Sequence, residues 1–402
     1  MTARLRIDTE ARRIRLAVRH RLAPSRRTND VCAIADDLVA LHSSDPVTVY
    51  LSAAARMRNP SREPVAAALY DDHTLIRHHA MRRTLWVFTP AVARLAHAAC
   101  TTGLAERERR RLVAQVEASG LAANGAAWLD AARRDVLAAL CEGGEATARK
   151  LGAAVPSLQA KLRLDVGKQY AADVAAHTRV LLLLGFEGAI VRGRPSGTWI
   201  NAEYHWAEAR VAGGLTGVDP ADAMVQLARR WLRSFGPATV ADLQWWMGWT
   251  MATTRRALAG PDVVDVDLDG DEGVMLADDL ADLDADAREP WVALLPALDP
   301  STMGWKRRDW YLPSAHTALL FDRNGNAGPT IWVDGRVVGG WVQRRNGEIA
   351  LRLLEDVGRD RRSEIDAAAA RLAELLGPTR FSVRFPAPIQ AELLQRSWAG
   401  FV

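Results

Sequence analysis

Residues 220–279 carry the pattern that decides the fold: PADAMVQLARRWLRSFGPATVADLQWWMGWTMATTRRALAGPDVVDVDLDGDEGVMLADD. Apolar residues recur every three or four positions over residues 220–235, which predicts an amphipathic helix. A Gly-Pro pair follows and ends this helix. Thr239 and Asp242 then have the spacing of a capping box, which predicts the start of a second short helix.

The second half of this stretch completes a structural unit. Residues 253–258 predict a third helix, which carries Arg255 and Arg256. The residues after it alternate between apolar and acidic types, which predicts a hairpin with a tight turn at Gly270-Asp271. Three helices and a hairpin make a winged helix, that is, a helix-turn-helix followed by a β-wing.

The same order of elements recurs in two earlier parts of the chain. In the nearer copy Arg192 and Arg194 flank the predicted hairpin tip at 195–197. In the first copy the strand stretch TLIRHHAMRRTLWVFTP spans residues 74–90. In the first copy the predicted helices are residues 29–41, 47–57 and 62–71. In the nearer copy the predicted helices are residues 131–141, 145–154 and 170–184, and the predicted hairpin is residues 190–199.

The last part of the chain has the sequence pattern of strands and turns rather than that of helices. Asn-Gly or Asp-Gly pairs at 324–325, 334–335 and 346–347 separate β-rich runs, which predicts an antiparallel meander. A helix at 363–376, a strand at 380–385 and a closing helix near 388–398 are expected to follow. The predicted fold class is therefore α+β, with tandem winged-helix units followed by a β-rich C-terminal domain. The predicted domains are residues 1–115, 116–215, 216–289 and 290–402.

Composition limits the classes of protein that remain. The chain has 402 residues, of which 49% are hydrophobic and 25% charged, which is ordinary for a folded chain of two or three domains. It contains neither an apolar run of the ~18 residues that a membrane helix needs nor a signal-peptide core. Its three scattered cysteines favour neither a disulfide framework nor a zinc site. We expect a soluble cytoplasmic protein, associated with the nucleoid, that acts as a monomer.

The charge is unevenly distributed along the chain. Residues 1–120 hold 20 arginines and 12 acidic residues, whereas the net charge of the whole chain is only +4. Guanidinium groups fork onto phosphate oxygens and guanine edges, so the basic N-terminal third indicates a polyanionic partner. A bias in genomic base composition would also favour arginine over lysine.

The sequence lacks the motifs of several common enzyme classes. It has no GxGxxG after a strand, no Walker loop, no GxSxG elbow and no HExxH. The acidic row from Asp265 to Asp269 is similar to a calcium loop, but Leu276 stands where a bidentate glutamate is required. These acids are expected to form the solvated face of a strand that points away from phosphate. We expect no metal and no cofactor.

The segment His42-Ser43-Ser44-Asp45-Pro46 is the strongest candidate for chemistry. An imidazole, a hydroxyl and a carboxylate lie within four residues at a helix break, where they could position and polarise a water molecule. Each residue also has a structural interpretation. His42 would interact with the C-terminal dipole of the preceding helix, and Asp45 would be an N-cap with Pro46 at the first helical position.

The strand stretch at 74–90 is unusually basic, with Arg77, Arg82 and Arg83 beside two histidines. A phosphate-tracking wing would have such a face. The alternative is the solvated face of a half-buried hairpin.

Five segments together resemble one known family. They are LVALHSSDPVTVYLSAAARM, IRHHAMRRTLWVFTP, FGPATVADLQWWMGW, LLPALDPSTMGWKRRDWYLP and FDRNGNAGPTIWVDGRVVGGW. These segments are similar to the helix-turn-helix superfamily of bacterial DNA glycosylases, in which tandem winged helices excise bulky alkylated or crosslinked purines. The resemblance extends from about residue 15 to residue 395. It implies a DNA-binding surface built from the winged helices.

The resemblance also assigns roles to particular residues. Active members of the family carry Gln-x-Gln or Gln-x-Asp at the loop where this chain has His42 and Ser44, so these two occupy the functional positions. Asp45 lies next to them and could supply the carboxylate. A second departure is the MRRTLW segment, where the family has MRGTLH, so that Arg83 replaces a glycine and Trp86 a histidine.

The expected activity is hydrolysis of the N-glycosidic bond of purines alkylated at N7 or N3, in damaged double-stranded DNA. By resemblance, a C-terminal hairpin tip with Arg323, Asn324 and Asn326 would enter the groove near the lesion. Two alternatives stay open: a non-catalytic regulator or lesion sensor in which His-x-Ser marks a lost active site, and an enzyme on another substrate. The expected DNA-binding residues are Arg77, Arg82, Arg83, Arg192, Arg194, Arg255, Arg256, Arg323, Asn324 and Asn326.

Overall fold

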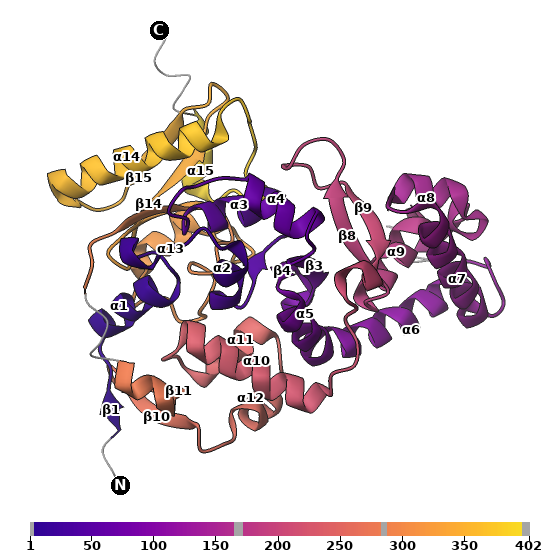
Figure 1. The fold of residues 1–402 in the computed structure, drawn as a ribbon, viewed down its shortest axis with the longest axis horizontal. Helices are drawn as coiled ribbons and strands as arrows, with labels where there is room; N and C mark the ends of the chain where they lie inside the picture. Colours follow the sequence, from indigo (N-terminus) through magenta and orange to yellow (C-terminus); the bar gives the residue numbers. More distant parts are fainter. Residues whose placement is uncertain (1–3, 165–171, 283–287, 396–402) are drawn as a thin grey trace. The chain divides into compact units, whose positions relative to one another are not determined.

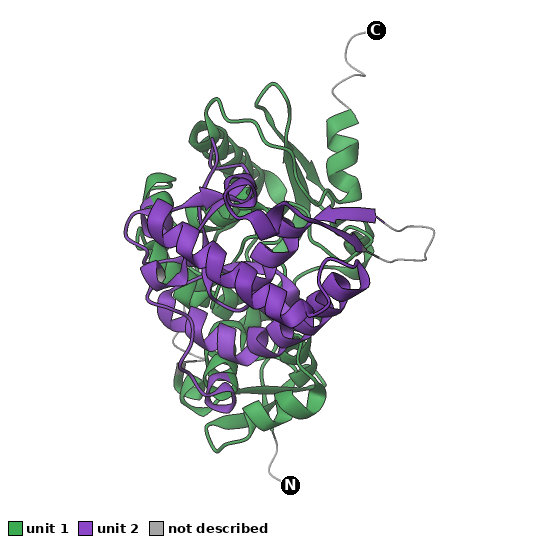
Figure 2. Ribbon diagram, turned by 90° about the vertical axis from the view of Figure 1, so that its right-hand side faces the viewer, with its two compact units in different colours: residues 1–66, 224–402 green, residues 67–223 purple. Residues whose placement is uncertain are grey.

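A computed structural model describes residues 4–164, 172–282 and 288–395. The chain forms two compact units (Figure 2). Unit 1 combines residues 1–66 with residues 224–402, and unit 2 is formed by residues 67–223. Within the described part of the chain, no helix is long and apolar enough to span a membrane.

The N-terminal part of unit 1 consists of short elements that lead to the candidate loop (Figure 1). Asp8 caps α1 by accepting the backbone N–H of Ala11, and Asp30 caps α2 in the same way through Cys32 and Ala33. The elements are β1 (Leu5–Arg6), α1 (Thr9–Arg19), η1 (Pro24–Arg26), α2 (Val31–Asp37), β2 (Leu41–His42) and α3 (Pro46–Ala54), and α4 (Glu63–Tyr70) follows at the junction with unit 2.

The stretch that opened the sequence analysis folds largely as expected. It forms α10 (Pro220–Phe235), α11 (Val240–Met247), α12 (Met251–Leu258), β10 (Val263–Leu268), β11 (Asp271–Leu276) and η6 (Ala277–Asp282). The capping box of Thr239 and Asp242 is present. The tight turn lies one residue earlier than predicted, at Asp269-Gly270, because these two residues have the positive φ values (54° and 97°) that a two-residue hairpin turn needs. The sequence pattern also did not reveal β1, which adds to β10 in parallel.

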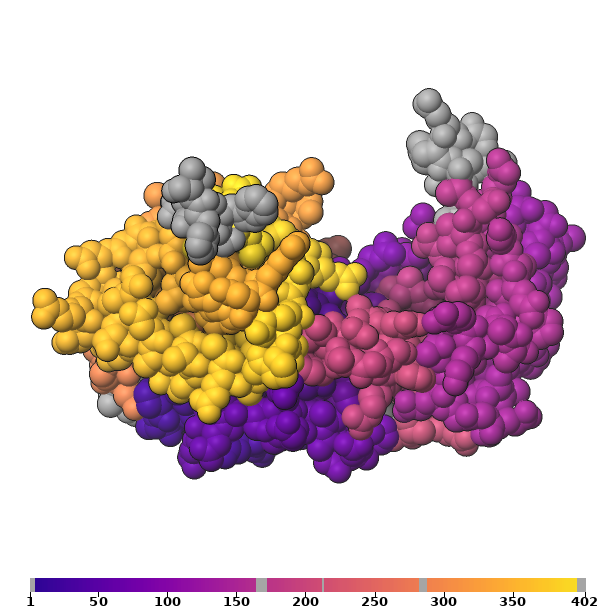
Figure 3. Space-filling view, turned by 90° about the horizontal axis from the view of Figure 1, so that it is seen from above, coloured from indigo at the N-terminus to yellow at the C-terminus, as the bar shows by residue number. Residues whose placement is uncertain are grey.

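The C-terminal part of unit 1 is a four-stranded antiparallel sheet in the order β12-β13-β14-β15. Helix α14 packs against β12 and α15 against β14. Figure 3 shows these late segments, orange to yellow, on the surface of unit 1. The elements are β12 (Val292–Leu295), α13 (Ser314–Leu320), β13 (Thr330–Val333), β14 (Arg336–Gln343), β15 (Ile349–Leu353), α14 (Gly358–Leu376) and α15 (Pro388–Gln395).

The strand predicted at 380–385 does not form. Its backbone N–H groups are taken by side chains: Gln343 accepts from Phe381 at 3.2 Å and Asp45 accepts from Arg384 at 3.4 Å. An alternating pattern cannot reveal such bonds, which replace those of a ladder. The closing helix ends at Gln395, and the rest of its predicted range lies outside the described residues.

Unit 2 is mainly helical around an apolar core in which Leu129, Val136 and Val180 are fully buried. The hairpin predicted at 190–199 exists, but β8 pairs with residues 204–208, so its tip is longer than expected. The helix predicted at 170–184 begins at Ala176, after strand β7, and residues 170–171 lie outside the described residues. The elements are β3 (Ile76–His79), η2 (Met81–Arg83), β4 (Leu85–Phe88), α5 (Pro90–Ala96), η3 (His97–Thr101), α6 (Thr102–Ala118), α7 (Gly125–Gly143), β5 (Ala146–Thr147), α8 (Ala148–Ala154), η4 (Pro156–Gln159), β6 (Lys161–Leu164), β7 (Ala172–Ala175), α9 (Ala176–Phe186), β8 (Ile190–Pro195), β9 (Tyr204–Glu208) and η5 (Ala209–Ala212).

Candidate active site and nucleic-acid interface

The loop between β2 and α3 places the three candidate catalytic residues next to one another. His42 is the last residue of β2, and Asp45 is the N-cap of α3, where Pro46 occupies the first helical position. A carboxylate followed by proline starts a helix efficiently, because it accepts a free N–H and the proline lacks one. The predicted N-cap is therefore confirmed, and this cap fixes where the carboxylate lies.

His42 is 3% exposed, and its Nδ1 accepts the backbone N–H of Ser44 at 3.3 Å. A neutral imidazole that accepts through Nδ1 carries its proton on Nε2. In this arrangement the Nε2 edge of the ring is a hydrogen-bond donor. His42 can therefore orient a water or a substrate oxygen but does not offer Nδ1 as a base, while the Ser44 side chain beside it is partly exposed.

Asp45 is 6% exposed and accepts the backbone N–H groups of Val47 at 3.3 Å and Arg384 at 3.4 Å. Burial raises the pKa of Asp45, and this outweighs the two hydrogen bonds and the nearby charge of Arg384, which lower it. A carboxylate held in this way can accept a proton or stabilise a developing cation. Sequence analysis missed Arg384, because a predicted strand gave no reason to place it beside Asp45.

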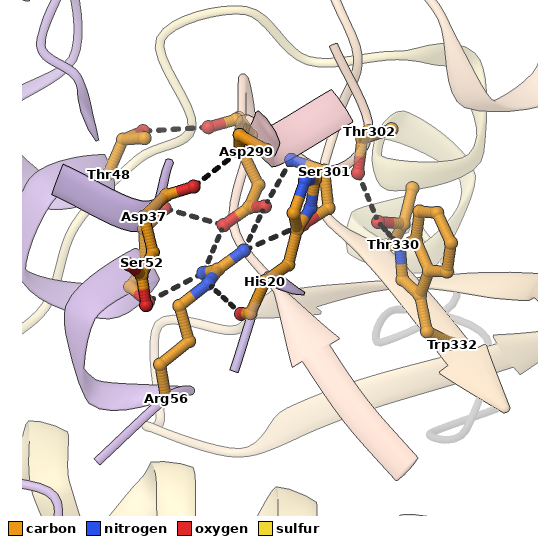
Figure 4. Close-up of polar contacts among 12 residues, drawn as sticks. His20, Asp37, Thr48, Ser52, Arg56, Asp299, Ser301, Thr302, Thr330 and Trp332 are labelled. Carbon is orange, nitrogen blue, oxygen red and sulfur yellow. Dashed lines mark hydrogen bonds and ion pairs between the residues drawn. The ribbon is translucent and has the colours of Figure 1, made fainter. Parts of the chain in front are cut away.

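A buried polar network holds the helix that carries this loop (Figure 4). Arg56 and Asp299 are both 0% exposed and form a two-pronged ion pair at 2.9 and 2.8 Å. Ser52 donates to the same carboxylate at 2.6 Å, and Thr48 donates to the carbonyl of Ala297 at 2.8 Å. Two successive turns of α3, at Thr48 and Ser52, and Arg56 just after its C-terminal cap are thus bonded to residues 297–299.

The network continues to the N-terminal helix. Arg56 donates to the carbonyl of His20 at 2.9 Å and to Ser301 Oγ at 2.7 Å, and this hydroxyl lies 2.8 Å from His20 Nδ1. Burial, and after it the charge of Arg56, lowers the pKa of His20 to about 3, so the ring is neutral at physiological pH. Sequence analysis missed this network. Its signal is the spacing of Thr48, Ser52 and Arg56, which forms a polar stripe along an otherwise apolar helix.

The basic strand in unit 2 does not have the exposed cationic face that its sequence suggested. All four residues of β3 are buried, with Arg77 at 2%, His78 at 2% and His79 at 9% exposure. Burial, helped by neighbouring charges, lowers the pKa of His79 to about 3 and that of His78 well below its ordinary value. Both expectations for this strand, a phosphate-tracking face and a solvated face, are wrong at these three positions.

Arg77 instead belongs to a stack of cations and aromatic rings. Its guanidinium lies 4.4 Å from the ring centre of Tyr204 and donates to the hydroxyl of Tyr70 at 3.0 Å. Arg192 lies 4.9 Å from the ring centre of Trp206. Arg194 is exposed, lies 5.0 Å from the ring centre of Tyr70 and pairs with Asp71 at 2.6 Å. Stacking fixes these guanidinium groups without using all of their donors.

The turn between β3 and β4 carries Arg82 and Arg83, whose φ values of 54° and 60° are left-handed. L-residues rarely adopt this conformation, and glycine does so freely. The family pattern has glycine at the position of Arg83, so the arginine accepts a conformational cost here. Arg83 is exposed and pairs with Glu108 at 2.8 Å. Trp86, the second departure, is fully buried and donates to the carbonyl of Met81 at 3.3 Å.

In unit 1, Arg255 and Arg256 are exposed on the last turn of α12. The acidic row from Asp265 to Asp269 is neutralised in part by the N-terminal segment, since Arg4 pairs with Asp265 at 3.5 Å and Arg6 with Asp269 at 2.9 Å. This row therefore forms an exposed, salt-bridged face, in line with the expectation of a solvated strand.

The predicted hairpin tip at 322–326 is a closed loop organised by Asp322. The carboxylate accepts the backbone N–H groups of Asn324 and Asn326, both at 2.8 Å, and the side-chain amide of Asn326 at 2.9 Å. Burial alone would raise the pKa of Asp322, but these hydrogen bonds lower it. Arg323 and Asn324 are exposed at the tip, whereas Asn326 holds the loop together.

Comparison with known proteins identifies the class. Residues 35–375 match the family model described as DNA glycosylase AlkZ-like, so the chain belongs to the AlkZ-like DNA glycosylase family, and it is a DNA-binding repair glycosylase.

A solved structure, that of Streptomyces sahachiroi DNA glycosylase AlkZ, is similar with a TM-score of 0.72. The two sequences are 20% identical over 95% of this chain and 99% of that chain, which shows the shared α+β fold. Among curated proteins, none is similar enough to count as a match.

Proposed function

We propose that this protein is a monofunctional DNA glycosylase that hydrolyses the N-glycosidic bond of purines carrying bulky N7 or N3 alkyl groups in damaged duplex DNA. It would act as a monomer and bind DNA through tandem winged helices. The observation that carries the proposal is that one loop holds the buried carboxylate of Asp45 three residues after the buried imidazole of His42, whose Nδ1 accepts the backbone N–H of Ser44.

The chemistry follows from the substrate. A purine alkylated at N7 or N3 is already a cationic leaving group, so it needs little general-acid assistance. Its departure leaves oxocarbenium character at C1′, which the Asp45 carboxylate stabilises electrostatically. His42, through Nε2–H, and Ser44 orient the water that attacks C1′, and Asp45 accepts the proton that this water loses.

A Schiff-base mechanism receives no support from the sequence. The chain has four lysines (Lys150, Lys161, Lys168 and Lys306), and none of them lies in or near residues 42–45 along the chain. A lyase would use an amine nucleophile and would cut the DNA strand after base removal. Simple hydrolysis leaves an intact abasic strand instead.

The test is incubation of the purified protein with duplex DNA that carries an N7-alkylated purine, followed by detection of free base and of strand breaks. We expect free base with an unbroken abasic strand. Strand cleavage together with a covalent protein–DNA adduct, formed when borohydride reduces a Schiff base at C1′, would contradict monofunctional hydrolysis. Tight binding without base release, on every alkylated duplex tried, would instead favour a regulator or lesion sensor whose His-x-Ser loop has lost activity.

A further inference from the structure

Unit 1 contains an arginine-lined cleft of about 1020 Å³ that neither the candidate loop nor the predicted DNA-binding residues account for. Its walls are the end of α1, the segment after it, the end of α2 and one face of α10. The cationic lining residues are Arg19, Arg21, Arg26, Arg229, Arg230 and Arg233.

Buried and half-buried aspartates fix several of these arginines in place. Asp279 is fully buried and accepts from Arg19 at 3.1 Å and Arg233 at 2.9 Å, and Arg15 donates to its other oxygen. Arg229 forms two bonds to Asp262, at 2.8 and 2.7 Å. These pairs orient the side chains, and Arg229 also donates to the carbonyls of Ala257 and Ala259. A guanidinium group has five donors, so the exposed Arg230 can offer several to an anion.

Among the described residues, arginines outnumber aspartates in and around the cleft. The six lining arginines and Arg15 face five aspartates: Asp36 and Asp37 in the lining and Asp262, Asp278 and Asp279 as partners. The arginines in this set exceed the aspartates by two. Arg230 is exposed, and it has no hydrogen bond or ion pair with any residue that the structure describes, while Arg26 is exposed on the facing wall.

The lining indicates the chemical class of the ligand. Arginines at fixed positions recognise phosphate oxygens in pairs of parallel hydrogen bonds. Among the described residues, the lining contains no aromatic side chain on which a nucleobase could stack, and its apolar members are Val18 and Val225. A ligand recognised here presents phosphate rather than a base or a sugar ring.

We propose that this cleft binds the sugar-phosphate backbone of a DNA segment, independently of its sequence, as a contact separate from residues 42–45 and from the hairpin tip at 322–326. The inference deepens the proposed function, because it takes the DNA substrate from that function. Asp37 at the end of α2 lines the cleft, and His42 follows five residues later, so one short segment connects the two sites.

The experiment measures how the affinity for an undamaged duplex depends on salt. Arg26→Ala/Arg230→Ala removes two cations from opposite walls, and the matched control Arg345→Ala/Arg359→Ala removes two exposed cations elsewhere in unit 1. Each lost phosphate contact lowers the slope of log K against log salt by about 0.9, so the cleft variant should lose about 1.8 and the control nothing. Equal slopes for wild type and cleft variant would overturn the proposal.

A second variant covers the case in which the double substitution disturbs folding. Gln226→Glu adds one negative charge to the same face of α10 without removing any ion pair, and it should also weaken duplex binding. Unchanged affinity in a correctly folded Gln226→Glu protein would count against the cleft.

Two further arms separate the sources of phosphate and the two proposals. Inorganic tripolyphosphate should compete with the duplex only weakly. If tripolyphosphate instead saturates the cleft at low concentration, while the affinity for the duplex is the same with and without Arg26 and Arg230, the cleft is a small-anion site and the proposal is wrong. Base release by the wild type is measured separately. If no base is released, the glycosylase proposal fails, and the salt dependence of duplex binding still tests the cleft.

Discussion

The Nδ1 atom of His42 accepts the backbone N–H of Ser44, two residues further along, at 3.3 Å. This bond fixes the tautomer and leaves Nε2–H as the only proton that the ring can present to a substrate or water. The family resemblance places glutamine at the corresponding position of active members, and a glutamine amide also presents an N–H donor. The His42 imidazole can therefore replace an amide in orienting water without acting as the base.

His42→Ala should lower base release from N7-alkylated duplex by 10²-fold or more, on the order of one positioned catalytic group, with DNA affinity nearly unchanged. His42→Gln should retain activity within about tenfold, because the amide restores a donor. Single-turnover release of free base measures both variants. Equal losses in the two would show that donation by residue 42 is not what matters.

Asp45→Asn separates the chemical role of this side chain from its role as a cap. Asparagine caps helices about as well as aspartate and can keep the bond from Val47, but it loses the acceptor for the Arg384 N–H, so the thermal unfolding midpoint should change little. Because burial raises the pKa of Asp45 in the folded state, its ionisation opposes folding as pH rises through that pKa, and the neutral asparagine removes this cost. Base release should nevertheless be lost.

The pH profile of the wild type gives an independent check on Asp45. If the ionised carboxylate is required, activity rises with pH through the raised pKa of Asp45, so the acid limb lies above the ordinary value of 3.8. An acid limb that is unchanged in a partly active Asp45→Asn protein would assign that limb to another group.

The pair formed by Arg56 and Asp299 should dominate the stability of α3. Asp299→Asn leaves a buried guanidinium without its counter-ion and should lower the free energy of unfolding by about 3–5 kcal/mol in urea titrations. The control Asp262→Asn breaks a more exposed pair with Arg229 and should cost about 1 kcal/mol or less. A similar loss of unfolding free energy in the two variants would show that burial does not make the ion pair of Arg56 and Asp299 more important for stability than an exposed pair.

The pH dependence of this pair has a definite sign. Burial alone would raise the pKa of Asp299, but the charge of Arg56 and the hydrogen bonds from Arg56, Ser52 and Ser301 lower it overall. The folded value then lies below the unfolded one of about 3.9. Its contribution to stability is complete above that unfolded value and is lost as pH falls through the folded value.

The cations of the first hairpin should divide into two groups. Arg82→Ala/Arg83→Ala should reduce the salt slope of DNA affinity by about 0.9 per lost phosphate contact. Arg77→Ala should mainly lower stability, because this buried guanidinium packs on Tyr204. If the salt slope falls for Arg77→Ala and stays constant for Arg82→Ala/Arg83→Ala, then Arg77 contacts phosphate and the other two arginines do not.

The hairpin tip at 322–326 predicts a preference for damaged DNA. Arg323→Ala/Asn324→Ala removes the two exposed side chains and should weaken binding to alkylated duplex more than to plain duplex. Asn326→Ala acts through the loop, since its amide bonds to Asp322, and should raise the mobility of the tip. If the affinities for alkylated and plain duplex fall equally, the tip contacts the DNA backbone without recognising damage.

The sequence predicts the elements that local patterns determine and misses those that depend on distant partners. Helix α10 has the predicted bounds, Pro220–Phe235, because its periodicity and its Gly-Pro stop are local signals. Strand β1 was missed because two residues show no period, and they pair with β10 about 260 positions later. Residues 380–385 alternate as a strand does, yet Gln343 and Asp45 take their backbone donors.

The candidate site shows the same division. The N-cap at Asp45 follows from its neighbour Pro46 and was predictable. The burial of Asp45 beside Arg384, and the attachment of α3 to Asp299, depend on residues from the far end of unit 1 and leave only faint traces in the sequence.

The division of unit 1 into two separated stretches sets an order for biosynthesis. Arg56 and Asp299 are 243 residues apart, so at roughly 5–20 residues per second the ribosome delivers the carboxylate some 12–50 seconds after the guanidinium. Unit 2 is contiguous and can fold during that interval. The first 66 residues must wait as a nascent segment with an uncompensated cation. Translation speed and chaperone protection over this interval thus become determinants of how much active protein a cell obtains.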